Sequence, residues 1–97
     1  MNMSTEMSFE SVWDALEDNP VRALNLRLRS GLLIHINEEL DSLGLSQSKI
    51  AEMLEITQPR VSALRTGKIE NFRLDSLVDI AHRLGLRVSL RIAACQE

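Results

Sequence analysis

The chain has 97 residues, enough for one small folded domain, and its 44% hydrophobic content argues against a disordered polypeptide. No apolar run reaches the roughly 18 residues that span a bilayer, and the amino terminus lacks the basic-then-apolar layout of a signal peptide. We therefore expect a cytoplasmic protein with no membrane partner. The single cysteine, Cys95, excludes an intramolecular disulfide.

The net charge of −3 is unevenly distributed along the chain. Residues 1–20 contain five acidic residues and no Lys or Arg, whereas residues 21–97 contain all eleven basic residues and nine acidic ones. The first segment is therefore strongly acidic and the remainder is slightly basic. An acidic protein of this kind can still present a locally basic surface to a partner.

We expect a mainly all-α fold with five helices in one domain, residues 8–92, between flexible tails at 1–7 and 93–97. Four apolar residues at helical spacing predict a first helix that begins at Ser8: Phe9, Val12, Trp13 and Leu16. Asn19 and Pro20 are suited to open a second helix over residues 20–43, with Gly44 as its stop. A kink, a break or a close helix contact is expected at Gly31. The buried stripe of this second helix is predicted to be Leu24, Leu28, Leu32, Ile36, Leu40 and Leu43.

Further helices are predicted over residues 46–54, 58–66 and 74–84. After them the period changes to two, which is typical of a half-buried strand over residues 87–92. Its apolar side consists of Val88, Leu90 and Ile92. Because no other segment resembles a strand, the most economical partner is the same strand of a second copy, which predicts a homodimer. The alternative is that this segment stays as coil or lies along its own core.

Residues 45–68 contain the pattern that is most informative about function. Ser46 and Thr57 are suited to cap two successive short helices, and Ile56 is suited to anchor the turn between them. Apolar residues on the inner face are expected to be Ile50, Ala51, Leu54, Val61 and Leu64. The outward face of the second helix then offers side chains suited to base edges in the major groove of DNA: Gln58, Pro59, Arg60, Ser62 and Ala63.

Phosphate contacts are expected from the ends of these helices and from nearby basic residues, because amides at a helix start and cationic side chains both attract phosphate. The candidates are Ser46, Gln47, Thr57, Arg65, Lys68 and Arg73. Without further information, a helical hairpin with a solvated polar face would explain the same pattern.

The motif resembles the Xre/Cro-like helix-turn-helix family, whose members have a lambda-repressor-like fold. The matching elements are the Leu-Ser-Gln opening at 45–47, the Ile-Ala-x-x-Leu core at 50–54, Ile56, the Thr-Gln pair at 57–58 and the Gly-Lys pair at 67–68. Glu55 departs from the pattern, since the family usually has glycine there. The resemblance implies sequence-specific DNA binding.

Over residues 12–92 the chain is similar to the HigA-type antitoxin branch, through Val12-Trp13-Asp14-Ala15-Leu16, the Thr57-to-Ser62 run and the ending 86–92. Members of that branch repress their own operon as dimers and bind a RelE-like ribonuclease toxin. This resemblance implies an autorepressor on a palindromic operator. Phe9, Trp13 and Leu16 would then either contact the toxin or pack on the protein's own core.

Other functions remain as alternatives: a phage-type or stand-alone Xre repressor without a toxin, or a protein-interaction module with the same fold. Catalysis is not expected. Neither His35 nor His82 has a ligand set or a nucleophile at suitable spacing, and no glycine-rich phosphate loop is present. We therefore predict no enzyme activity, no cofactor and no metal site.

Overall fold

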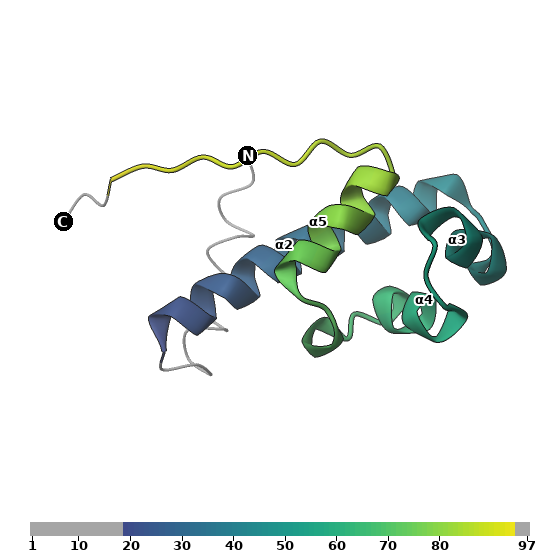
Figure 1. The fold of residues 1–97 in the computed structure, drawn as a ribbon, viewed down its shortest axis with the longest axis horizontal. Coiled ribbons are helices and arrows are strands. Elements are labelled where there is room, and N and C mark those ends of the chain that lie inside the picture. The colour runs from purple at the N-terminus through teal and green to yellow at the C-terminus, as the bar shows by residue number, and fades with distance from the viewer. Residues whose placement is uncertain (1–18, 95–97) are drawn as a thin grey trace.

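A computed structural model of the chain describes residues 19–94. Within this range the elements are α2 (Pro20–Leu43), α3 (Gln47–Leu54), α4 (Gln58–Arg65), the 3₁₀ turn η1 (Ile69–Asn71) and α5 (Leu74–Arg83). Figure 1 shows α2 as the long spine of the fold, with α5 beside it and α3 and α4 near its carboxyl end. The predicted helix that begins at Ser8 lies outside the described residues, so the predicted five-helix count is not reached here.

Both ends of α2 are where the sequence predicts them. The Asn19 side chain accepts hydrogen bonds from the backbone N–H groups of Val21 and Arg22, at 2.9 and 3.3 Å. At the other end, Gly44 is left-handed, with φ 64°, and its N–H donates to the Leu40 carbonyl. The helix runs through Gly31 without a break, and a Cβ there would meet no atom within 4 Å. The expected break or close contact at this glycine is therefore absent.

The predicted apolar stripe of α2 is only partly correct. Ile36 and Leu40 are buried as expected, but Leu24 and Leu28 are 48% and 49% exposed, and Leu33 takes a place in the core instead. An α-helix has about 3.6 residues per turn, so residues spaced by four drift around it by about 40° at each step. The five residues spaced by four from Leu24 to Leu40 therefore cannot all lie on the one face of α2 that meets the core.

The core lies where α2 meets the shorter helices. Every inner residue predicted for the motif is buried, and Ile56 packs against the same cluster. The buried cluster contains Leu33, Ile36, Leu40, Ile50, Ala51, Leu54, Val61, Leu64, Phe72, Leu77, Ile80 and Ala81. α3 and α4 are thus fixed to α2 and α5 through one continuous apolar interior.

The predicted strand over residues 87–92 is absent from the single chain. The segment after α5 has no regular secondary structure, and Figure 1 shows it leaving the helices as an open trace. A strand requires a ladder of backbone hydrogen bonds, and residues 19–94 contain no other extended element that could supply one. Alternation of apolar and polar residues alone does not create such a ladder.

Glu55 adopts the backbone conformation that the family usually assigns to glycine at this turn. It ends α3 with φ 59°, and it is the only non-glycine residue with positive φ in the part of the chain that the structure describes. Its carboxylate lies 3.0 Å from Arg83 Nη1, and Arg83 Nε lies 3.4 Å from Asp79. A hydrogen bond to Asp79 and the charges of both carboxylates raise the pKa of Arg83. The turn is therefore joined to α5 by an ion pair while its backbone is strained.

We expect Glu55→Gly to be more stable than Glu55→Ala by about 1 kcal/mol, because glycine removes the Cβ penalty of the left-handed conformation. Both variants lose the carboxylate, so the ion pair with Arg83 does not contribute to the difference between them. Thermal unfolding followed by circular dichroism should show a melting temperature several degrees higher for the glycine variant. Equal melting temperatures would mean that the strain at position 55 does not exceed the entropy that glycine loses on folding.

Candidate nucleic-acid interface

Both short helices of the motif, α3 and α4, begin with a side-chain N-cap. Ser46 Oγ accepts a hydrogen bond from the Lys49 N–H at 3.2 Å, and Thr57 Oγ1 accepts one from the Arg60 N–H at 3.3 Å. Both caps match the prediction from sequence. Val61 and Leu64 are completely buried, which fixes the rotation of α4 about its axis. The opposite face of α4 therefore points away from the core.

The residues predicted to contact bases divide into two groups on that face. Gln58, Pro59 and Ser62 are exposed, whereas Arg60 and Ala63 are half-buried. Ala63 packs against the edge of the core, so it offers less of its surface than the sequence suggested. Of the predicted phosphate contacts, those exposed are Ser46, Gln47, Thr57, Lys68 and Arg73.

The Arg60 side chain is held within the protein. Its Nη1 donates a hydrogen bond to the Asn71 carbonyl at 2.9 Å, and its Cζ lies 4.3 Å from the centre of the Phe72 ring. The sequence pattern marked Arg60 only as outward-facing. Phe72 lies between the helices predicted over residues 58–66 and 74–84, so no periodicity linked it to Arg60.

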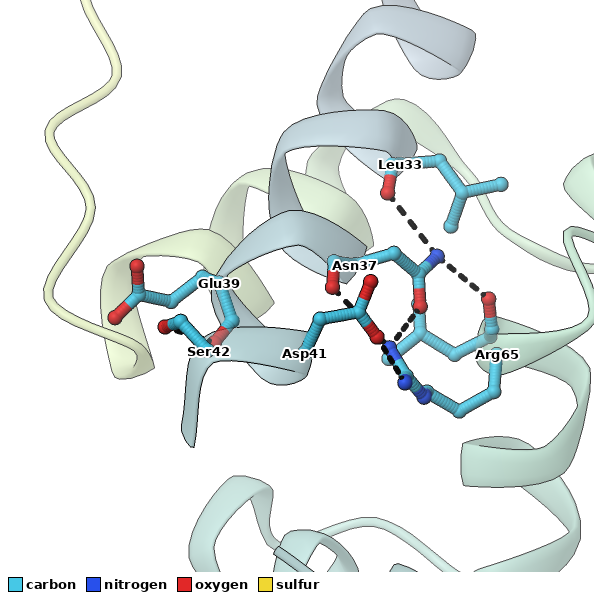
Figure 2. Close-up of polar contacts among 7 residues, drawn as sticks. Leu33, Asn37, Glu39, Asp41, Ser42 and Arg65 are labelled. Atoms are coloured by element: carbon cyan, nitrogen blue, oxygen red, sulfur yellow. Dashed lines mark hydrogen bonds and ion pairs between the residues drawn. The ribbon is translucent and has the colours of Figure 1, made fainter. Parts of the chain in front are cut away.

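Arg65 is also engaged within the protein, and Figure 2 shows its guanidinium directed at α2. Its Nη1 donates to the backbone oxygen and to Oδ1 of Asn37, at 3.2 and 2.7 Å. Its Nη2 forms an ion pair with Asp41. A phosphate contact by Arg65, which stays a prediction, would have to compete with that carboxylate.

Asn37 is a positioning residue that the sequence reasoning missed. Its Nδ2 donates to the Leu33 carbonyl at 3.1 Å within α2 and to the Leu64 carbonyl at 3.0 Å at the end of α4 (Figure 2). The Leu64 carbonyl also accepts a hydrogen bond from the Gly67 N–H, so the amide is a second donor to it and fastens α4 to α2. No local sequence signal identified Asn37, because the Leu64 carbonyl lies 27 residues further along the chain.

Within residues 19–94 no group of three or more His, Cys, Asp or Glu side chains is arranged to hold a metal ion. No helix in that part of the chain is long and apolar enough to cross a membrane.

Two short capped helices joined by a tight turn, with the second helix presenting a polar face, define a helix-turn-helix protein. A family model described as a helix-turn-helix domain matches residues 15–93, so the chain belongs to that family. A solved structure described as a transcriptional regulator of the XRE family is 32% identical, with a TM-score of 0.69 over 73% of this chain and 80% of the other. The chain is therefore an Xre-like helix-turn-helix protein. No curated protein sequence matches it.

Proposed function

We propose that the protein is a sequence-specific DNA-binding transcriptional regulator and that α4 is its recognition helix. The observation that carries the proposal is the exposed polar face of α4. This helix is capped at its start, and its opposite face is buried in the core. The major groove of B-DNA is wide enough to admit an α-helix and displays a distinct donor and acceptor pattern for each base pair. A rigidly anchored helix with an exposed polar start is suited to read that pattern.

Roles for the individual side chains follow from their chemistry. Gln58 is suited to pair bidentately with adenine, and Arg60 with guanine. Ser62 can bond to either kind of base edge, while Pro59 and Ala63 offer apolar contact, for example to a thymine methyl group. Phosphates on either side would be held by groups around both helix starts and by basic residues nearby: Ser46, Gln47, Thr57, Arg65, Lys68 and Arg73.

We expect Gln58→Ala to weaken binding to the specific site by about 1–3 kcal/mol and to relax the base preference at one position. Lys68→Ala should weaken binding to all sequences alike and reduce the salt slope by about one unit, because it removes a phosphate contact. Fluorescence anisotropy with the upstream operator and with unrelated duplexes, at several salt concentrations, measures both effects.

His35→Ala is the control, since this exposed side chain lies on α2, outside the helix-turn-helix. It should bind as the parent protein does. If Gln58→Ala and Lys68→Ala also bound the operator like the parent, α4 would not be the recognition helix.

We also propose that two copies pair through residues 87–92 as an antiparallel ribbon. Val88, Leu90 and Ile92 are 42%, 81% and 87% exposed in the single chain, which leaves an apolar edge in water. A second copy of the same segment would cover it and satisfy the backbone groups. Two recognition helices could then meet successive major grooves about 34 Å apart, so the operator would be palindromic.

Sedimentation at micromolar concentration should show a dimer for the parent protein. Leu90→Asp should give a monomer, because a carboxylate on the apolar side of the ribbon would be buried without a partner. Ser89→Asp places the same charge on the opposite side and should remain a dimer. A parent protein that sediments as a monomer would exclude the ribbon.

The finer proposal is that this regulator is an antitoxin that represses its own operon and binds a RelE-like toxin. It is supported by the sequence resemblance over residues 12–92 and by the acidic character of residues 1–20. A ribonuclease is expected to be basic, and an acidic segment would complement it. Phe9, Trp13 and Leu16 are the proposed apolar contacts.

Replacing Phe9, Trp13 and Leu16 together by serine should abolish capture of the basic ribonuclease encoded by the neighbouring gene while operator binding persists. If the triple variant captured the ribonuclease as the parent protein does, these three residues would not be toxin contacts. If no such gene adjoins this one, the alternative of a stand-alone repressor is favoured.

A further inference from the structure

Two arginines fasten the segment between α4 and α5. From α2, Arg29 Nη1 donates to the carbonyls of Ile69 and Phe72, both at 3.1 Å, while its Nε is held by Asn25 at 2.7 Å. From α4, Arg60 Nη1 donates to the Asn71 carbonyl. The backbone around Phe72 is therefore fixed by hydrogen bonds from two helices, α2 and α4.

The Phe72 ring forms a rigid base for the Arg60 guanidinium. The ring is 1% exposed and belongs to the core, so its position is set by packing. The 4.3 Å separation between Arg60 Cζ and the ring centre is well within the roughly 6 Å range of cation–π attraction. Ring and carbonyl together restrict a side chain that would otherwise have many rotamers.

The two half-buried arginines of α4 differ in what holds them. Arg65 is paired with the carboxylate of Asp41, which offsets its charge. Among residues 19–94, the contacts of the Arg60 guanidinium are a neutral carbonyl and a neutral ring. Arg60 is therefore not paired with an acidic side chain in the described part of the chain, and its Nε and Nη2 edge has the planar fork that matches the O6 and N7 acceptors of guanine.

We infer that Phe72 is a specificity-determining positioning residue, which holds Arg60 so that its remaining edge reads guanine. This inference rests on the proposed function of α4. Phe72 itself is buried and makes no contact with the base. Its effect is to reduce the rotamer entropy that Arg60 loses when it binds, and to exclude orientations in which the fork would meet other acceptors.

The opposite effect is the competing physical outcome. If Arg60 had to leave Phe72 in order to reach the groove, the ring would compete with DNA. Weakening that contact would then strengthen guanine recognition. The sign of the change on substitution of Phe72 therefore distinguishes positioning from competition.

The experiment is enrichment of a randomised duplex library with the full chain, followed by affinity measurements on the enriched duplex and on its single-base variants. The parent protein should enrich one guanine that Arg60→Ala no longer prefers, with roughly 5- to 150-fold weaker binding to that duplex. Phe72→Leu should lower the preference for the same guanine and leave the position read by Gln58 unchanged. In the Arg60→Ala background, Phe72→Leu should have no further effect on base preference.

Leu77→Ala is the matched control, because Leu77 is a buried core residue of α5, whereas the Arg60 guanidinium bonds to Asn71 and lies over Phe72. It should lower stability without changing base preference. Binding is measured at a temperature where circular dichroism shows each variant folded. Arg60→Lys keeps the charge but lacks the planar fork, so it should retain part of the affinity and lose the guanine preference.

A guanine preference that is unchanged or stronger in Phe72→Leu would overturn the inference. If that variant does not fold, Arg60→Lys decides: retention of the guanine preference would overturn it. A third outcome is that Arg60→Ala has the same base preferences as the parent while Gln58→Ala changes one of them. The inference about Phe72 would then be wrong, but the proposed function of α4 would still hold. If the parent enriches no sequence, both fail.

Discussion

The burial of Val61 and Leu64 is the contact on which the arrangement of α4 depends. Isolated helices shorter than about 12–15 residues are marginal in water, and α3 and α4 have eight residues each. Their stability must therefore come from caps and from the shared core. The same burial that makes α4 a helix also selects which of its faces meets water. Fold and exposed polar face are thus two results of one packing arrangement.

Local signals in the sequence were sufficient for most of the helix boundaries. Asn19, Gly44, Ser46 and Thr57 act through atoms a few residues away, so their roles follow from neighbouring positions alone. The failures concern long-range geometry. The face of α2 that meets the core depends on where α5 and α4 lie, and a leucine repeat at spacing four cannot report that. The strand predicted over residues 87–92 is absent from the single chain for a related reason, since the hydrogen-bond partner expected for it is a second copy.

The candidate interface shows the same division between local and distant information. Sequence spacing identified which residues of α4 are turned away from the core, and the structure agrees for Gln58 and Ser62. It could not show that Arg60 meets Phe72 or that Arg65 meets Asp41, because these partners lie in other elements. Through those contacts, Arg60 is held by neutral groups and Arg65 by an acidic side chain. The sequence shows that both residues are arginines, but only the three-dimensional structure shows which of them is paired with an acid.

The exit of the chain from α5 has a consequence for assembly. Gly85 has φ 82°, the Leu86 N–H donates to the Ala81 carbonyl at 2.9 Å, and Leu86 packs against the core. The direction in which the carboxyl segment leaves is therefore set by the monomer itself. The start of this segment, up to Leu86, is already fixed before a partner binds. Only residues beyond Leu86 then lose conformational freedom on binding. A side chain at position 85 would strain this left-handed turn, so a glycine far from α4 helps to set how two copies could be oriented.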